Sequence, residues 1–133
     1  MLNFSIKELC HSDIAQQYGI NNNPSIEVSD NLLNLIFYLL QPLRDKIKKP
    51  MLISSGYRCP KLNSHPKIKG AANSNHLYGF AADVQVSGMT PRKFWLFVKE
   101  SGLEYDECIL EYNQWVHLAF RKGANRKRFF EIS

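Results

Sequence analysis

Two histidines and one aspartate constrain the fold of this chain more than any other feature of its sequence. His76 and Asp83 lie within one short segment, and His117 lies near the C-terminal end. A fold that brings the three side chains together creates a metal site with three protein ligands and one open position. That is the ligand count of a catalytic zinc site, whereas a structural zinc site has a fourth ligand, usually cysteine. No cysteine lies within ten residues of His76 or Asp83.

The residues around Asp83 and His117 place both on the same side of a sheet. Residues 81–86 and 115–120 alternate apolar side chains with others, as strands with one buried face do. The apolar positions are Ala82, Val84 and Val86 in the first segment and Val116, Leu118 and Phe120 in the second. Asp83 and His117 therefore point away from the core, towards a face where a cleft can form. His76 lies in the loop before the first strand.

These residues belong to a longer pattern, Ser-x-His-x-x-Gly-x-Ala-x-Asp followed by Trp-x-His. Its defined positions are filled by Ser74, His76, Gly79, Ala81, Asp83, Trp115 and His117. Upstream, residues 55–58 read Ser-Gly-Tyr-Arg. In these three motifs the chain resembles the zinc D-Ala-D-Ala carboxypeptidase family. In that family the segment that corresponds to residues 55–58 carries a substrate-binding arginine. The resemblance extends from Phe4 to Phe120, nearly the whole chain.

The family includes D-Ala-D-Ala dipeptidases and phage L-Ala-D-Glu endolysin peptidases, and it shares its fold with the Hedgehog signalling domain. The resemblance implies one Zn²⁺, held by His76, Asp83 and His117. It implies a substrate with D-amino acids, the stem peptide of peptidoglycan. It also implies that Arg58 binds the carbonyl or terminal carboxylate of that peptide, because a guanidinium can grip such groups with two hydrogen bonds. A structural salt bridge is the alternative role for Arg58.

Three more side chains are candidates for the substrate cleft. Ser74 is expected either to orient a metal ligand or to contact the substrate. Tyr78 and Trp115 are expected to form walls of the cleft rather than to take part in the chemistry. All three lie within or beside the motifs that contain the predicted metal ligands.

The general base is the least determined residue. Peptide hydrolysis at zinc needs a carboxylate that takes a proton from the attacking water and passes it to the leaving amine. The family has an acid three positions before its last ligand, but here that position is Gln114. We predict Glu111 as the base, provided that the turn after it contains an odd number of residues, which puts Glu111 on the face of His117. Glu107 and Asp106 are the fallbacks, and a rim carboxylate paired with a lysine is the alternative role for Glu111.

The pattern along the chain predicts an α+β fold, a small antiparallel sheet packed against helices, as in the Hedgehog and DD-peptidase proteins. Helices are expected at 6–18, 32–47 and 91–100, the second capped by Ser29 or Asp30, kinked at Pro42 and buried nearly all round. Strands are expected at 51–54, 81–86, 108–111 and 115–120, with a tight turn at 112–114. Residues 59–73 are expected to be irregular. We predict one zinc peptidase domain over residues 1–133.

Composition excludes several classes of protein. The chain has 133 residues, of which 44% are hydrophobic, and no apolar run approaches the roughly 20 residues that span a bilayer. The N-terminus lacks a basic segment followed by an apolar one, so we expect synthesis in the cytoplasm without a signal peptide. Action on the cell wall then requires another route, as for phage lysins. We expect a monomer.

The remaining features allow alternative functions. Cys10, Cys59 and Cys108 are odd in number and widely spaced, and we expect packed thiols rather than disulfides, with a Cys59 nucleophile as the disfavoured alternative. Basic residues crowd the last thirteen positions and indicate attraction to an anionic polymer, cell wall rather than nucleic acid, because no nucleic-acid-binding motif accompanies them. A zinc-bearing, non-catalytic wall-binding or virion protein is the main alternative, favoured by Gln114.

Overall fold

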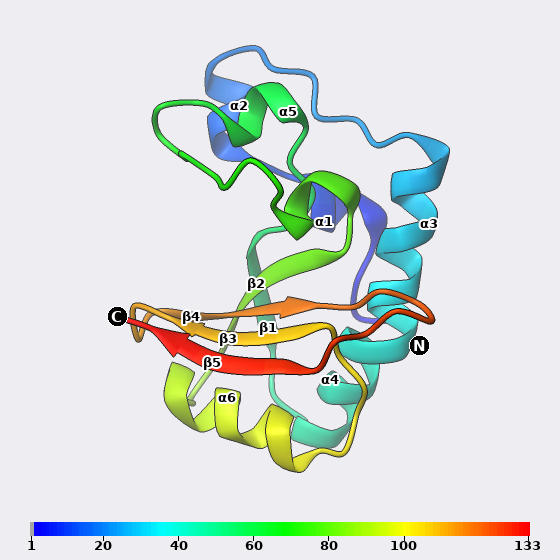
Figure 1. Cartoon of the computed structure of the whole chain (residues 1–133), viewed down its shortest axis with the longest axis vertical. Helices are drawn as coiled ribbons and strands as arrows, with labels where there is room; N and C mark the ends of the chain where they lie inside the picture. The colour runs from blue at the N-terminus through cyan, green and yellow to red at the C-terminus, as the bar shows by residue number, and fades with distance from the viewer. Residues whose placement is uncertain (1) are drawn as a thin grey trace.

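The computed structural model describes residues 2–133; Met1, within the predicted domain 1–133, lies outside the described residues. The fold is α+β, as predicted, and is built on a five-stranded sheet of order β1-β2-β4-β3-β5 (Figure 1). The strands are β1 (Met51–Ser55), β2 (Ala81–Val86), β3 (Glu107–Glu111), β4 (Trp115–Ala119) and β5 (Arg128–Ile132). All neighbouring pairs are antiparallel except β3 and β5.

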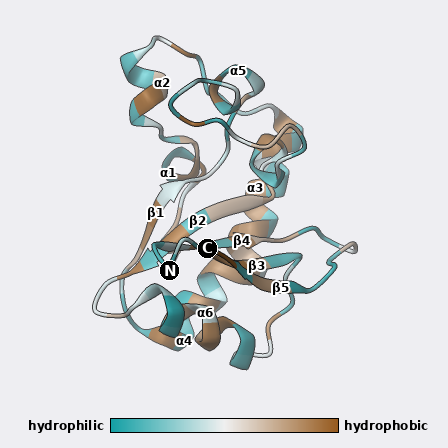
Figure 2. Ribbon diagram, turned by 60° about the vertical axis from the view of Figure 1, so that its left-hand side comes forward, coloured by the Kyte–Doolittle hydropathy of each residue, from teal (hydrophilic) through white to brown (hydrophobic). Residues whose placement is uncertain are grey.

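The sheet has one apolar and one polar face. The apolar face carries Ala82, Val84, Val116, Leu118 and Leu110, all fully buried. Helix α6 (Pro91–Glu100) packs against β2, β3 and β4, and its Phe94 and Val98 join the same core. Apolar residues recur along these strands and helices, drawn in brown in Figure 2. The opposite face contains Asp83 and His117, as the alternation of side chains predicted.

A second helical layer covers the rest of the core. It consists of α3 (Ile26–Leu35), a π-helical turn η1 (Ile36–Leu40) and α4 (Gln41–Ile47). The N–H of Gln41 bonds the carbonyl of Ile36, five residues back. Pro42 follows directly, and because proline has no N–H and its ring clashes with the preceding turn, the regular α-helical pattern is interrupted here.

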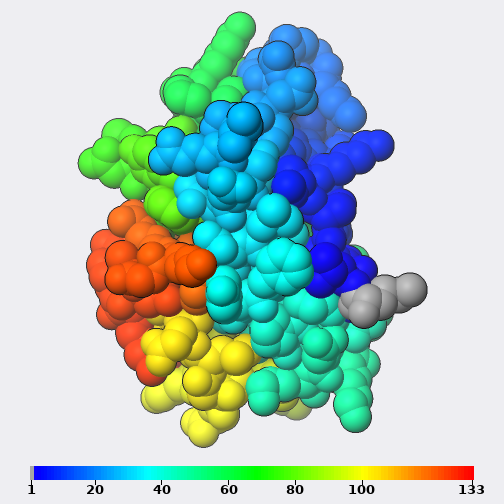
Figure 3. Space-filling model, turned by 90° about the vertical axis from the view of Figure 1, so that its right-hand side faces the viewer, coloured from blue at the N-terminus to red at the C-terminus, as the bar shows by residue number. Residues whose placement is uncertain are grey.

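Two predictions about these helices are wrong. The helix begins after Ser25, whose side chain accepts from the N–H of Val28, and not at Ser29 or Asp30. It is also not buried all round, because Phe37 and Tyr38 are 53% and 48% exposed. This helical layer forms the surface across the middle of the molecule in Figure 3. The apolar pattern placed Tyr38 in the core. In the structure its ring instead stacks on Phe120 while about half of the side chain stays exposed.

The first helix is interrupted as well. Ser5 caps α1 (Ile6–Cys10), and Ser12 caps a separate α2 (Asp13–Gln17), because its side chain accepts from the N–H of Ala15. A serine cap favours a new helix start over continuation of the old one. The segment 59–73 contains a short helix, α5 (Pro60–Asn63), where only irregular structure was expected. Helix α6 begins at Pro91 behind its Thr90 cap, as predicted.

Strand β5 was not predicted at all. Residues 126–128 are Arg-Lys-Arg, and this charge masks the strand pattern that follows. Phe129 lies opposite Cys108 and stacks on Trp95 of α6 at a ring separation of 4.3 Å. The basic end of the chain is therefore tied to the sheet rather than solvated as a tail. Across residues 2–133, no helix combines the length and apolar character needed to cross a bilayer.

Candidate metal centre

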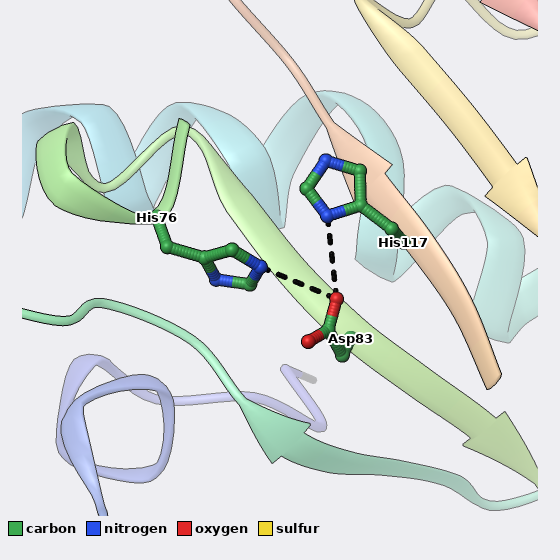
Figure 4. A group of neighbouring side chains, drawn as sticks. All are labelled: His76, Asp83 and His117. Carbon is green, nitrogen blue, oxygen red and sulfur yellow. Dashed lines mark hydrogen bonds and ion pairs between the residues drawn. The ribbon is translucent and has the colours of Figure 1, made fainter. Parts of the chain in front are cut away.

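Three elements bring the candidate ligands together. His76 lies on η2 (Asn75–Tyr78), a 3₁₀ turn directly before β2. Asp83 lies on β2 and His117 on β4, and the two are directly paired across the strands. Directly paired residues on antiparallel strands share a face, so both side chains project to the polar side of the sheet. Figure 4 shows the two imidazoles approaching the Asp83 carboxylate from either side.

The distances between the ligand atoms fit a zinc ion. Oδ1 of Asp83 lies 3.2 Å from Nε2 of His76 and 3.3 Å from Nδ1 of His117. Two ligands of a tetrahedral zinc site with bonds of about 2.0–2.1 Å lie roughly 3.3 Å apart. One ligand atom from each residue lies within 4.8 Å of the others, and all three residues are buried. Two imidazoles and one carboxylate are donors that zinc prefers, so the residues present fit the ion.

The backbone around His76 is fixed by neighbouring residues. The side chain of Ser74 accepts from the N–H of His76 and caps the 3₁₀ turn. Gly79 ends the turn with a left-handed φ of 78°, and a Cβ there would lie 2.8 Å from the carbonyl oxygen of Val28. Only glycine fits such a position without strain. Ser74 therefore orients a predicted ligand, and it also lines the cleft described below.

Hydrogen bonds outside the centre fix both imidazoles. Nδ1 of His76 donates to the carbonyl of Gly56 at 2.7 Å, because a carbonyl can only accept, so Nε2 is the nitrogen that faces Asp83 and is available to a metal. The Nε2 of His117 lies 2.9 Å from Oε1 of Glu107. The histidines therefore face Asp83 through different ring nitrogens, Nε2 in His76 and Nδ1 in His117.

The charges in the centre stabilise one another in the absence of metal. Burial alone would raise the pKa of Asp83, but the two imidazoles outweigh it and hold that pKa well below its usual range. Burial alone would lower the pKa of His117, but its hydrogen bonds to Asp83 and Glu107 raise the pKa to about 9. A metal ion must therefore displace a proton from His117 at neutral pH.

The centre lies in a cleft of about 750 Å³. Its lining includes most of the predicted site residues, Arg58, Ser74, His76, Asp83, Glu111, Trp115 and His117. Tyr78 is not among the lining residues. It is 46% exposed and packs against Phe80 at a ring separation of 5.9 Å. The structure therefore gives Trp115, but not Tyr78, a place in the wall of this cleft.

Arg58 reaches the cleft without a charged partner in hydrogen-bond contact. Its Nε is buried and has no hydrogen-bond partner among residues 2–133, and its Nη1 only touches Oγ of Ser55 at 3.5 Å. Burial lowers the pKa of Arg58, while Asp83 and Glu111 act in the opposite direction. The backbone is rigid: Asn22 bonds the carbonyl of Tyr57 and the N–H of Cys59, the peptide groups on either side of Arg58.

The β3–β4 hairpin places Glu111 on the face of His117. Glu111 pairs with Trp115 across a three-residue turn, in which Tyr112 and Asn113 have left-handed φ values of 54° and 55°. The loop is odd in length, so Glu111 and Trp115 share the face of His117. Oε1 of Glu111 accepts from the indole N–H of Trp115 at 2.9 Å.

The fallback acids lie in different surroundings. Asp106 is fully buried and accepts two side-chain hydrogen bonds from Arg126. Glu107 contacts the ring nitrogen of His117 that faces away from Asp83. Asp106 does not line the cleft, and Glu107 lines it but is engaged by His117 and Arg128, so Glu111 remains the candidate base.

The sequence did not point to Asn75, a buried residue that joins Asp106, Glu107 and Arg121 through hydrogen bonds. Its Nδ2 donates to Oδ2 of Asp106 at 3.1 Å and to Oε1 of Glu107 at 2.8 Å, and its Oδ1 accepts from Nε of Arg121. Asn75 directly precedes His76, and only that adjacency could have indicated its importance. Its partners lie far away in the sequence.

The cysteines take no part in the centre. Cys108 is buried and Cys10 and Cys59 are half-buried, and all three are free. Burial raises the pKa of the Cys10 thiol to about 11, which keeps it protonated at neutral pH. None of the three lines the cleft.

A buried His-Asp-His set in a cleft that also holds an arginine and a carboxylate is a group that could bind a metal ion. Comparison with protein families agrees: the model of the family Peptidase M15 matches residues 2–119. The chain belongs to the Peptidase M15 family, which confirms the resemblance to the zinc D-Ala-D-Ala carboxypeptidases. Membership of this family makes the chain a metallopeptidase-type hydrolase, and the buried His76-Asp83-His117 group is one that could bind a metal. No curated protein matches the chain.

Proposed function

We propose that this chain is a zinc-dependent peptidoglycan peptidase. It cleaves a peptide bond next to a D-amino acid in the stem peptide, as D-Ala-D-Ala carboxypeptidases or L-Ala-D-Glu endopeptidases do. The observation that carries the proposal is the buried ligand set of His76, Asp83 and His117 in a cleft that also holds Arg58 and Glu111. We also propose that it reaches the wall by a route like that of phage lysins.

The residues of the cleft divide the work of hydrolysis. Zinc, when bound by the three ligands, polarises the scissile carbonyl and makes a water molecule more acidic. Glu111 accepts the proton of the attacking water and returns it to the leaving amine. Trp115 holds Glu111 through the indole hydrogen bond and forms the wall beside it. The two imidazoles and Asp83 would hold the metal, and their lining of the cleft would let a substrate in the cleft reach it.

Arg58 supplies substrate recognition. Arg58 is half-buried, and its buried Nε has no hydrogen-bond partner among residues 2–133, an arrangement that costs free energy and that a carboxylate or carbonyl of the substrate would relieve by binding there. The lining of the cleft carries five arginine or lysine side chains against three acidic ones. This excess favours an anionic peptide, and peptidoglycan stem peptides carry free carboxylates.

Mass analysis of digested peptidoglycan tests the proposal. Purified walls of different stem-peptide chemistry are incubated with the parent protein, with the protein after chelation, and with chelated protein supplied again with zinc. We expect peptide release that chelation abolishes and zinc restores, and the mass of the fragments names the cleaved bond. Release that survives complete removal of metal contradicts the zinc mechanism. A zinc-loaded protein that binds walls but releases nothing from any of them supports the non-catalytic alternative.

A further inference from the structure

Among residues 2–133, Glu107 makes the one side-chain hydrogen bond that His117 has outside the ligand set. Its Oε1 lies 2.9 Å from Nε2 of His117, while Nδ1 of the same ring faces Asp83. The two nitrogens lie on opposite sides of the ring, so Glu107 and a metal bound at Nδ1 approach the imidazole from opposite directions. Glu107 therefore contacts the ligand rather than the metal.

The Glu107 carboxylate is itself held in place. It is 9% exposed, and its Oε2 accepts from Nη1 of Arg128 at 2.9 Å. Its Oε1 also accepts from Nδ2 of Asn75 at 2.8 Å. Asn75 is the residue before His76, so one carboxylate oxygen joins the ring of His117 to the turn that carries His76. A surface carboxylate that contacted His117 by chance would not be expected to accept hydrogen bonds from two further side chains as well.

We propose that Glu107 is a positioning residue for the zinc ligand His117. A carboxylate that accepts from the outer ring N–H fixes the tautomer, so that the Nδ1 lone pair points into the centre. It also fixes the ring orientation and makes the imidazole a better donor to the metal. Through Asn75, the same carboxylate links the two histidine ligands. The proposal rests on the proposed zinc site, but it does not depend on the substrate or on the identity of the base.

Zinc affinity of the metal-free protein tests this role without any measurement of hydrolysis. Competition with a chromophoric chelator is measured for the parent and for Glu107→Gln, which keeps the shape and removes the charge. Loss of such an outer partner typically weakens metal binding by about 10- to 100-fold, and we expect this range. The matched control is Glu104→Gln, since Glu104 is exposed and, among residues 2–133, pairs only with Lys127, at 3.5 Å. The control is expected to bind zinc like the parent.

A second readout separates positioning from a merely structural role. The absorption bands of the cobalt(II)-substituted protein report the geometry of the ligands, and we expect them to change in Glu107→Gln and not in Glu104→Gln. If Glu107→Gln fails to fold, Glu107→Asp decides, because it keeps the charge but is one methylene too short to reach His117. The proposal is overturned if the folded variant binds zinc within twofold of the parent and has an unchanged cobalt spectrum. Since the test is binding alone, an absence of hydrolysis would refute the proposed function and leave this inference standing.

Discussion

The metal ligands and Arg58 line the same cleft but are held in opposite ways. Both imidazoles have their outer nitrogen bonded, His76 to the Gly56 carbonyl and His117 to Glu107. Arg58 has a fixed backbone, but its buried Nε has no hydrogen-bond partner among residues 2–133. The metal ligands make their hydrogen bonds without the substrate, whereas the Nε of Arg58 still lacks a partner among residues 2–133.

This difference indicates which part of the site the protein prepares and which part the substrate completes. Hydrogen bonds that exist before metal arrives hold the ligands near their final geometry and reduce the cost of binding. The buried Nε of the half-buried Arg58 does the reverse, since a buried N–H without a partner raises the free energy of the empty site and favours a substrate group that accepts from it.

Glu111 lies where the two regions meet, because its charge acts on both His117 and Arg58. Glu111→Gln keeps the shape of the side chain and removes the proton acceptor. We expect a loss of about 10²- to 10⁴-fold in peptidoglycan hydrolysis, with zinc content unchanged. Released fragments and bound zinc are measured on the same preparation, with Glu104→Gln as the control. Hydrolysis at the parent rate by Glu111→Gln would mean that another group is the base.

Arg58→Lys tests the region that the substrate completes. Lysine keeps the charge but lacks the planar fork that can bind a carboxylate with two hydrogen bonds. Hydrogen bonds to charged groups contribute roughly 1.5–3 kcal/mol, so we expect kcat/KM to fall about 10- to 100-fold with zinc binding unchanged. Arg92→Lys is the control, since Arg92 pairs with Glu131 on the surface. If both variants retain full activity, Arg58 has a structural role only.

Asp106 tests the network behind the ligands. Burial alone would raise the pKa of Asp106, but hydrogen bonds from Arg126 and Asn75 outweigh it and lower the pKa. The stabilisation is therefore complete above the pKa of an unfolded aspartate, about 3.9, and is lost as the pH falls through the lower folded value. Asp106→Asn should reduce the free energy of unfolding at pH 7 by about 1–3 kcal/mol.

Denaturant unfolding across a pH series measures this effect. The gap between parent and Asp106→Asn should be constant at neutral pH and should narrow below about pH 4, where the parent loses its own carboxylate charge. Asp30→Asn, at an exposed position on α3 with no ion pair among residues 2–133, is the control and should match the parent throughout. A gap that stays the same down to the lowest pH would show that the charge of Asp106 is not the stabilising feature.

The metal ligands could be predicted from the sequence because two independent signals coincide on them. The spacing of His76, Asp83 and His117 matches a family pattern, and the alternation of apolar residues puts Asp83 and His117 on one face. Both signals can be recognised in short stretches of sequence, and the observed pairing of Asp83 with His117 agrees with both. The α+β fold followed from the same local patterns of helix caps and strand alternation.

The contacts of Glu107 and Asn75 could not be predicted, because they depend on strand register. Glu107 reaches His117 only because two left-handed residues set the β3–β4 turn. Arg128 of strand β5 donates a hydrogen bond to Glu107, but the basic residues of this segment did not predict a strand. The break between α1 and α2 was missed for a similar reason, since a serine cap competes with helix continuation over only one turn.

Zinc content of the ligand variants tests the central claim most directly. Metal analysis is carried out on the purified parent, on His117→Ala, and on the control His65→Ala, whose imidazole lies outside the cleft against Tyr18. Circular dichroism on each sample establishes that the protein is folded. We expect one zinc per chain in the parent and the control, and loss of most of that zinc in His117→Ala. A folded His117→Ala protein that retains one full equivalent of zinc would contradict it.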